Sequence, residues 1–174
     1  MARRDAEFAE YFAAHFDGAR RIGYALCGDW VEAEELAQAA FVRVYARWSA
    51  VHMATAGAYL RTVVTRLFLD SRRRGRARER STAELPELPV EAPLGRVEER
   101  MVLVAALQAV PPRQRAVLVQ RFLQDMSIEQ VAEVMNCSAG TVKSQTARGL
   151  EALRGAYLAL GGVVRGQVLD MRAG

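Results

Sequence analysis

The segment SIEQVAEVMNCSAGTVKSQTARGLEAL, residues 127–153, decides the fold of the C-terminal part of the chain. Ser127 and Gln130 have the spacing of a capping box, which predicts a short helix that begins directly after Ser127. Asn136 follows where the chain must turn in the left-handed conformation, which asparagine tolerates best after glycine. Ser138 is then placed to cap a longer helix. This order is typical of a helix-turn-helix.

The second helix of this motif, Ala139–Leu153, would enter the major groove of duplex DNA. Its outward side chains are short hydroxyls, an amide and cations, which can bond to phosphates or base edges. The candidate DNA-binding residues are Ser138, Thr141, Lys143, Ser144, Gln145 and Arg148. An ordinary helical hairpin with a solvated polar face is the alternative interpretation.

Helical periodicity continues toward the N-terminus. Apolar residues recur every three or four positions over most of residues 5–74, with no useful strand-like alternation. Asp29 is the predicted N-cap of a helix that runs to Trp48. A loop is expected over 49–57, followed by a helix over 58–73. The sequence therefore predicts an all-α protein.

Proline residues interrupt the helical periodicity after the third predicted helix. Residues 75–97 contain three prolines among serine, threonine and several glutamates, and proline cannot continue a helix. A connection of this length is unusual inside a compact domain. We therefore predict a helical domain over 5–74, a flexible linker over 75–97, a second small helical domain over 98–155 and a C-terminal tail over 156–174.

Composition excludes several classes of protein. The chain has 174 residues, of which 51% are hydrophobic, so wholesale disorder is excluded. No apolar run approaches the roughly 18 residues of a membrane span, and no secretory signal is visible. Two cysteines and two histidines do not make a disulfide framework or a metal centre. We therefore expect a cytoplasmic protein without a cofactor or metal. The sequence contains no glycine-rich phosphate-binding loop and no nucleophile elbow, so an enzyme is not expected.

The charges are distributed unevenly along the chain. Residues 72–80 hold six arginines against one glutamate, whereas residues 81–99 hold five glutamates against one arginine. A concentrated basic run indicates contact with a polyanion at a defined place. The alternative is a solvated, arginine-rich linker.

Four segments, in order, resemble the extracytoplasmic-function (ECF) sigma factors of bacterial RNA polymerase. Residues 29–41 (DWVEAEELAQAAF) resemble the helix that binds the core enzyme, and residues 59–73 resemble the helix that recognises the −10 promoter element. Residues 110–118 (VPPRQRAVL) resemble the opening of the fourth sigma domain. Residues 140–144 (GTVKS) resemble the start of its −35 recognition helix. The resemblance covers roughly residues 5–155.

The resemblance implies a transcription initiation factor with core RNA polymerase and promoter DNA as partners, an anti-sigma factor as a further partner, and no membrane insertion. It assigns core-polymerase binding to Glu32, Glu35, Leu36, Gln38, Phe41 and Val42. It assigns −10 DNA binding to Trp48, Tyr59, Arg61, Arg66, Arg72, Arg73 and Arg74. The −35 element would contact the six residues of the helix-turn-helix. Leu36, Phe41, Trp48 and Tyr59 could equally be core residues.

Two other classes remain open from the residues alone. A stand-alone helix-turn-helix regulator would bind duplex DNA as a dimer, with half-sites one helical turn apart. A helical adaptor that binds no DNA would not need the arginine run.

Overall fold

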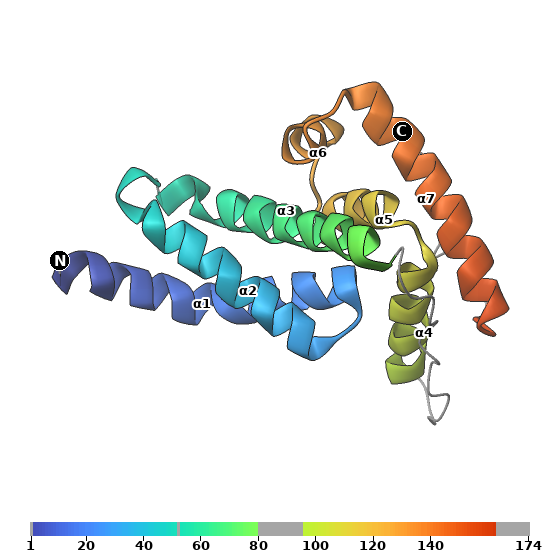
Figure 1. Ribbon diagram of the computed structural model, residues 1–174, viewed down its shortest axis with the longest axis horizontal. Helices are drawn as coiled ribbons and strands as arrows, with labels where there is room; N and C mark the ends of the chain where they lie inside the picture. The colour runs from blue at the N-terminus through green and yellow to red at the C-terminus, as the bar shows by residue number, and fades with distance from the viewer. Residues whose placement is uncertain (1, 52, 80–95, 163–174) are drawn as a thin grey trace.

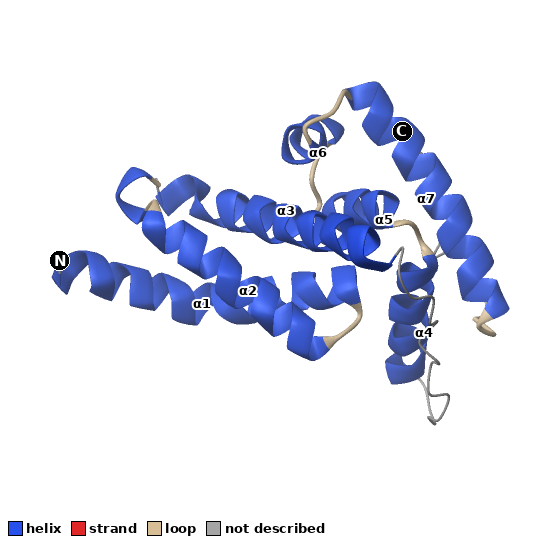
Figure 2. Cartoon of the chain, viewed as in Figure 1, coloured by secondary structure: helices blue, strands red, loops and turns tan. Residues whose placement is uncertain are grey.

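The computed structural model describes residues 2–51, 53–79 and 96–162, and the regular elements in these ranges are all helical (Figures 1 and 2). The predicted all-α class is confirmed. The elements are α1 (Ala2–Cys27), α2 (Trp30–Ala46), η1 (Trp48–Ala50), α3 (Met53–Glu79), α4 (Arg96–Ala109), α5 (Pro112–Leu118), η2 (Val119–Leu123), α6 (Ile128–Met135) and α7 (Ala139–Ala159). Among the described residues, no helix is long and apolar enough to cross a membrane.

Helices α1, α2 and α3 pack side by side as the N-terminal half (Figure 1). Gly28 has a φ of +75°, a conformation that glycine adopts without strain, and it makes the sharp turn between α1 and α2. Asp29 Oδ1 accepts a hydrogen bond from the Glu32 amide at 2.8 Å, so the predicted N-cap is confirmed. The apolar faces of the three helices meet in a core that includes Phe41 and Phe68.

Helices α4 to α7 form the C-terminal half. Pro112 lies in the first turn of α5, where its missing amide proton costs nothing. After Leu118 the helix widens into a π-helical turn, η2, before the chain reaches α6. Leu118 and Leu153 meet residues of α4 in a small core between α4, α5 and α7.

The helices extend past four of the predicted boundaries. Helix α3 begins at Met53 rather than at 58 and extends to Glu79, so residues 75–79 are not linker. Arginine is a good helix former and a single glycine is tolerated, whereas the first proline comes only at Pro86. Helix α4 likewise includes residues 96 and 97. Helix α7 continues through Gly155 to Ala159, into the predicted tail. The remaining linker and tail, 80–95 and 163–174, lie outside the described residues.

The two halves are packed against each other. In one cluster, the buried residues of α1, α2 and α3 are joined by residues of α5, η2, α6 and α7, such as Val119, Val131 and Val142. Figure 1 shows α5 and α6 lying over α3. The separate domains 5–74 and 98–155 stay a prediction about how the chain is organised.

Candidate nucleic-acid and polymerase interfaces

The helix-turn-helix is built as the sequence predicts. Ser127 Oγ accepts from the Gln130 amide at 3.1 Å, and Gln130 Oε1 accepts from the Ser127 amide at 2.8 Å, which completes the capping box. Asn136 has φ 50° and ψ 56°, the left-handed conformation. Ser138 Oγ accepts from the Thr141 amide at 3.1 Å and caps α7. These local bonds determine where α6 stops and where α7 starts.

The outer face of α7 presents the six predicted −35 residues together. Ser138, Lys143, Ser144 and Arg148 are exposed, and Thr141 and Gln145 are half-buried. The opposite face of α7 is buried against α5 and α6 through Val142, Thr146, Gly149 and Leu153. Packing on one side therefore leaves a polar, cationic face of α7 directed to solvent.

Helix α2 separates its six predicted core-polymerase residues onto two faces. Glu35, Gln38 and Val42 are exposed, whereas Leu36 and Phe41 lie in the core. The Phe41 ring is 2% exposed and lies 4.8 Å from the Phe12 ring, centroid to centroid. Leu36 and Phe41 therefore hold α2 in the bundle, so their assignment to a partner surface is not supported by the structure.

The exposed face of α2 also contains two residues that the sequence analysis missed, Val31 and Tyr45. Val31 is 70% exposed and Val42, one of the predicted residues, is 69% exposed. Val31, Glu35, Gln38 and Val42 follow the spacing i, i+4, i+7, i+11, which places them on one helix face. Tyr45 continues this face and is also exposed. The same spacing could have identified Val31 from the sequence.

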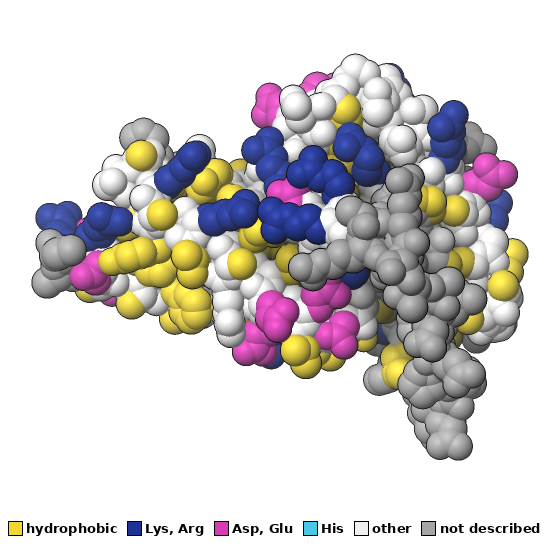
Figure 3. Space-filling view, in the orientation of Figure 1, with side chains coloured by type: hydrophobic (Ala, Val, Ile, Leu, Met, Phe, Trp, Pro, Cys, Tyr) yellow, Lys and Arg dark blue, Asp and Glu magenta, His cyan; other side chains and the backbone are white. Residues whose placement is uncertain are grey.

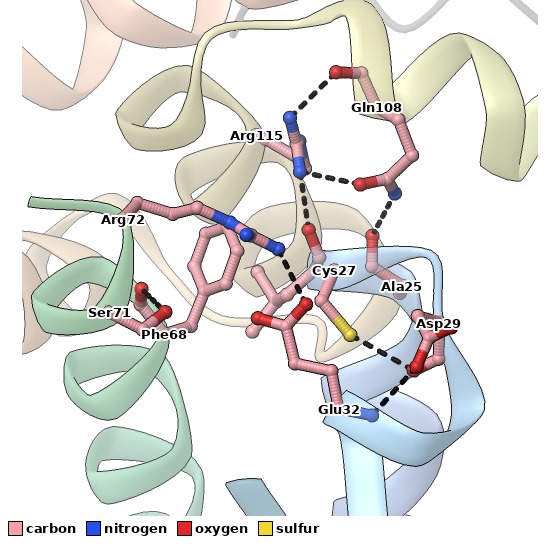
Figure 4. Close-up of polar contacts among 10 residues, drawn as sticks. Ala25, Cys27, Asp29, Glu32, Phe68, Ser71, Arg72, Gln108 and Arg115 are labelled. Carbon is pink, nitrogen blue, oxygen red and sulfur yellow. Dashed lines mark hydrogen bonds and ion pairs between the residues drawn. The ribbon is translucent and has the colours of Figure 1, made fainter. Parts of the chain in front are cut away.

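We call these five residues the α2 stripe: Val31, Glu35, Gln38, Val42 and Tyr45. Acidic side chains gather over the start of α2, and hydrophobic side chains gather nearer its end (Figure 3). The remaining predicted residue, Glu32, is half-buried and forms an ion pair with Arg72 of α3, with 2.9 Å between Oε2 and Nη2 (Figure 4). Glu32 therefore links α2 to α3 and is only partly available to a partner.

The predicted −10 residues are spread over η1 and α3. Trp48 lies in the core, with its ring 4.9 Å from that of Tyr11, so it offers no free face for base stacking. Tyr59 and Arg61 are half-buried, while Arg73 and Arg74 are exposed. Figure 3 shows Lys and Arg side chains in a row along α3.

Three of these arginines on α3 already have partners within the chain. Arg72 pairs with Glu32, and Arg66 donates to two main-chain carbonyls at the end of α6. Arg73 Nη2 lies 3.5 Å from Asp70 Oδ1, a loose surface pair that water screens. The structure thus brings a cationic row together on α3, but not as a set of free side chains.

Comparison with known proteins agrees with this geometry. The model of sigma-70 region 2 matches residues 11–78, and that of sigma-70 region 4 matches residues 100–153. The RNA polymerase sigma-E factor of Streptomyces coelicolor is 36% identical over 149 residues, 85% of this chain and 84% of that protein. The ECF RNA polymerase sigma factor SigE of Mycolicibacterium smegmatis is 34% identical over 157 residues, 86% of this chain and 61% of that protein.

A solved structure shares the fold. The sigma factor RpoE of Bartonella quintana, crystallised in complex with the anti-sigma factor NepR, matches with a TM-score of 0.69 at 22% identity, covering 91% of this chain and 99% of that one. The chain belongs to the sigma-70 family and is a sigma factor of the ECF type. It is a transcription initiation factor, a regulatory protein that binds core RNA polymerase and directs it to promoters, rather than a stand-alone regulator.

Proposed function

We propose that the α2 stripe is the surface that docks on core RNA polymerase. The single observation that carries this proposal is the exposure of two valines, Val31 and Val42, on the face of α2 opposite the core. An apolar face with an acidic rim suits a basic, apolar groove on a partner. Val31, Glu35, Gln38 and Val42 are exposed along this face, whereas the Tyr45 ring at its end packs 4.8 Å from that of Phe8 of α1.

In the same proposal, α7 and α3 bind different elements of the promoter. The exposed cationic face of α7 reads duplex DNA at the −35 element through the six residues from Ser138 to Arg148. The arginines of α3 hold the phosphates of the opened −10 strand, a contact that raises affinity without specificity and weakens with salt. The protein would act in the cytoplasm, where polymerase and promoter DNA meet.

An anti-sigma factor is the further partner that we propose. The support is the fold, because the structurally similar RpoE was crystallised in complex with the anti-sigma factor NepR.

The experiment is size-exclusion co-elution with bacterial core RNA polymerase, without DNA. Wild-type protein should form a complex. Val42→Arg combined with Gln38→Ala should raise the Kd of this complex by about tenfold or more, since a tenfold change in Kd corresponds to only about 1.4 kcal/mol of binding free energy. Both side chains are exposed, so circular dichroism should show unchanged folding. Arg43→Ala, on the same helix but off the stripe, is the matched control and should bind as wild type does.

Two results would contradict the proposal. Undiminished binding by the double variant would remove the α2 stripe as the docking surface. A chain that ignores core polymerase but shifts duplex DNA by itself would act as a helix-turn-helix regulator. Leu36→Ala is not a useful variant here, because it would create a cavity in the core and lower stability.

A further inference from the structure

A hollow on the cationic side of α3 lies where this helix packs against α5. Its volume is about 290 Å³, and it is lined by Leu69, Asp70, Arg72 and Arg73 of α3 and by Pro112 and Arg113 of α5. Ligand pockets in proteins run from about 300 to 1,000 Å³, so this hollow is at the small end of that range. It therefore fits a small molecule rather than a segment of a folded partner.

The charge of this lining is unbalanced. It contains three guanidinium groups, those of Arg72, Arg73 and Arg113, against the single carboxylate of Asp70. Arg73 Nη2 lies 3.5 Å from Asp70 Oδ1, and the Arg73 side chain is 79% exposed, so water screens this pair. Asp70 thus neutralises at most one of the three cations of the lining.

The other two arginines keep hydrogen-bond donors free. A guanidinium has five N–H donors. Arg72 uses Nη2 on Glu32 at 2.9 Å, and its guanidinium carbon lies 5.2 Å from the Phe68 ring centroid, so the group is held in place (Figure 4). Arg113 Nη2 donates only a long bond, at 3.5 Å, to the Met135 carbonyl. Within the described part of the chain, no carboxylate forms an ion pair with Arg113.

This arrangement favours a ligand that carries several negative charges close together. Guanidinium groups match phosphate oxygens with two parallel N–H···O bonds each. The three arginines come from two helices, so adjoining phosphoryl groups could engage them at the same time. A single phosphate or sulfate ion presents too few oxygens to satisfy all three groups.

We propose that the hollow between α3 and α5 binds a small polyphosphate through Arg72, Arg73 and Arg113. The ligand is a short chain of phosphoryl groups, either inorganic or carried by a nucleoside. Arg72 and Arg73 are shared with the proposed −10 surface, whereas Arg113 is not. The site thus goes beyond the proposed promoter contacts.

Two variants change the affinity in opposite directions. Arg113→Gln removes an exposed cation and should raise the Kd about tenfold, a usual effect of losing a charge-assisted hydrogen bond. Asp70→Asn removes the carboxylate that repels the ligand and should lower the Kd about fivefold, the size of a contact between two charges in water. The matched controls are Arg43→Gln and Glu10→Gln, which make the same charge changes on exposed side chains of α2 and α1.

Isothermal titration calorimetry measures these affinities on the full chain, without polymerase or DNA. The probes are sodium tripolyphosphate, adenosine triphosphate and sodium sulfate at equal, physiological ionic strength, with a chelator that removes divalent metal ions. Tighter binding of adenosine triphosphate than of tripolyphosphate would assign a nucleoside polyphosphate, with Leu69 and Pro112 as its apolar contacts. Equal or weaker binding would assign the inorganic chain.

We expect one polyphosphate per chain, a Kd that shifts as stated in the two variants, and no change in the two controls. Circular dichroism checks folding, and if Arg113→Gln unfolds, Asp70→Asn decides. The proposal is overturned if neither polyphosphate binds, if sulfate binds as tightly, or if Arg43→Gln weakens binding as much as Arg113→Gln does. A failure of the proposed polymerase docking would appear in the co-elution experiment and not here.

Discussion

At the scale of single residues, short polar side chains determine where the helices begin and end. Asp29, Ser127 and Ser138 each accept a bond from an amide three residues later, which satisfies a donor that the helix itself leaves free. Asn136 turns the chain between α6 and α7 in a conformation that most residues resist. Such bonds connect neighbours in the chain, and for this reason the sequence predicted all four.

Cys27 shows the opposite case, a residue whose chemistry depends on what surrounds it. The side chain is buried at the end of α1, and its Sγ donates to the Asp29 carbonyl at 3.2 Å. Burial raises the pKa of the Cys27 thiol from its ordinary value of 9.0 to about 11, against a smaller lowering by that hydrogen bond. The thiolate is the reactive form, so Cys27 should be inert at neutral pH.

We predict that iodoacetamide at pH 8 modifies Cys27 about a hundredfold more slowly than an unfolded thiol, since two pKa units reduce the thiolate by that factor. Mass spectrometry of the native protein measures this rate, and the denatured protein is the control. The raised pKa also means that this group's contribution to stability is present below pH 9 and is lost as the pH rises to 11. Rapid native labelling of Cys27 would contradict the buried position.

At the scale of the elements, the two opposite faces of a helix have different roles. In α2 the positions of Ala33, Leu36 and Val44 bury one face, and this burial leaves the α2 stripe on the other. A sequence motif spans both faces, so it cannot separate residues that bind a partner from residues that hold the helix. The division of the predicted core-polymerase set into exposed and buried members follows from that geometry.

Two glycines in α7 allow a test of how tightly this helix packs. A Cβ added at Gly155 would meet nothing within 4 Å, whereas one at Gly149 would lie 3.1 Å from Leu118 Cγ. We predict that Gly155→Ala raises the free energy of unfolding by about 0.5–1 kcal/mol, because glycine costs a helix that much. Gly149→Val should lower it by about 1–3 kcal/mol through overpacking against α5.

Urea denaturation followed by circular dichroism measures both changes. Gly155→Val is the matched control and should stay within about 0.5 kcal/mol of wild type, as exposed substitutions usually do. A Gly149→Val variant as stable as wild type would show that α5 and α7 pack less closely than in this structure.

At the scale of the whole molecule, the two halves share a buried core. The cluster that contains Phe68 of α3 also contains Val131 and Val142 of the helix-turn-helix. Elements that share a core lose it together when either one unfolds. The halves should therefore unfold as one unit despite the residues that separate them in the chain.

We predict a single thermal transition in scanning calorimetry, with equal calorimetric and van't Hoff enthalpies, which is the test of two-state unfolding. Two resolved transitions in the wild-type protein would show that the halves are independent in solution.

Much of this molecule was determined by the sequence itself: the helices and their caps, the helix-turn-helix, the cationic row on α3 and the family. These features depend on periodicity and on bonds between near neighbours, which are readable along the chain. Only the tertiary structure decided which side of α2 is free, that Trp48 is in the core, and that Gln120 of η2 donates a hydrogen bond to Thr65 of α3. Those contacts join residues far apart in sequence, and their energy comes from the exclusion of water between surfaces, a property that no single segment possesses.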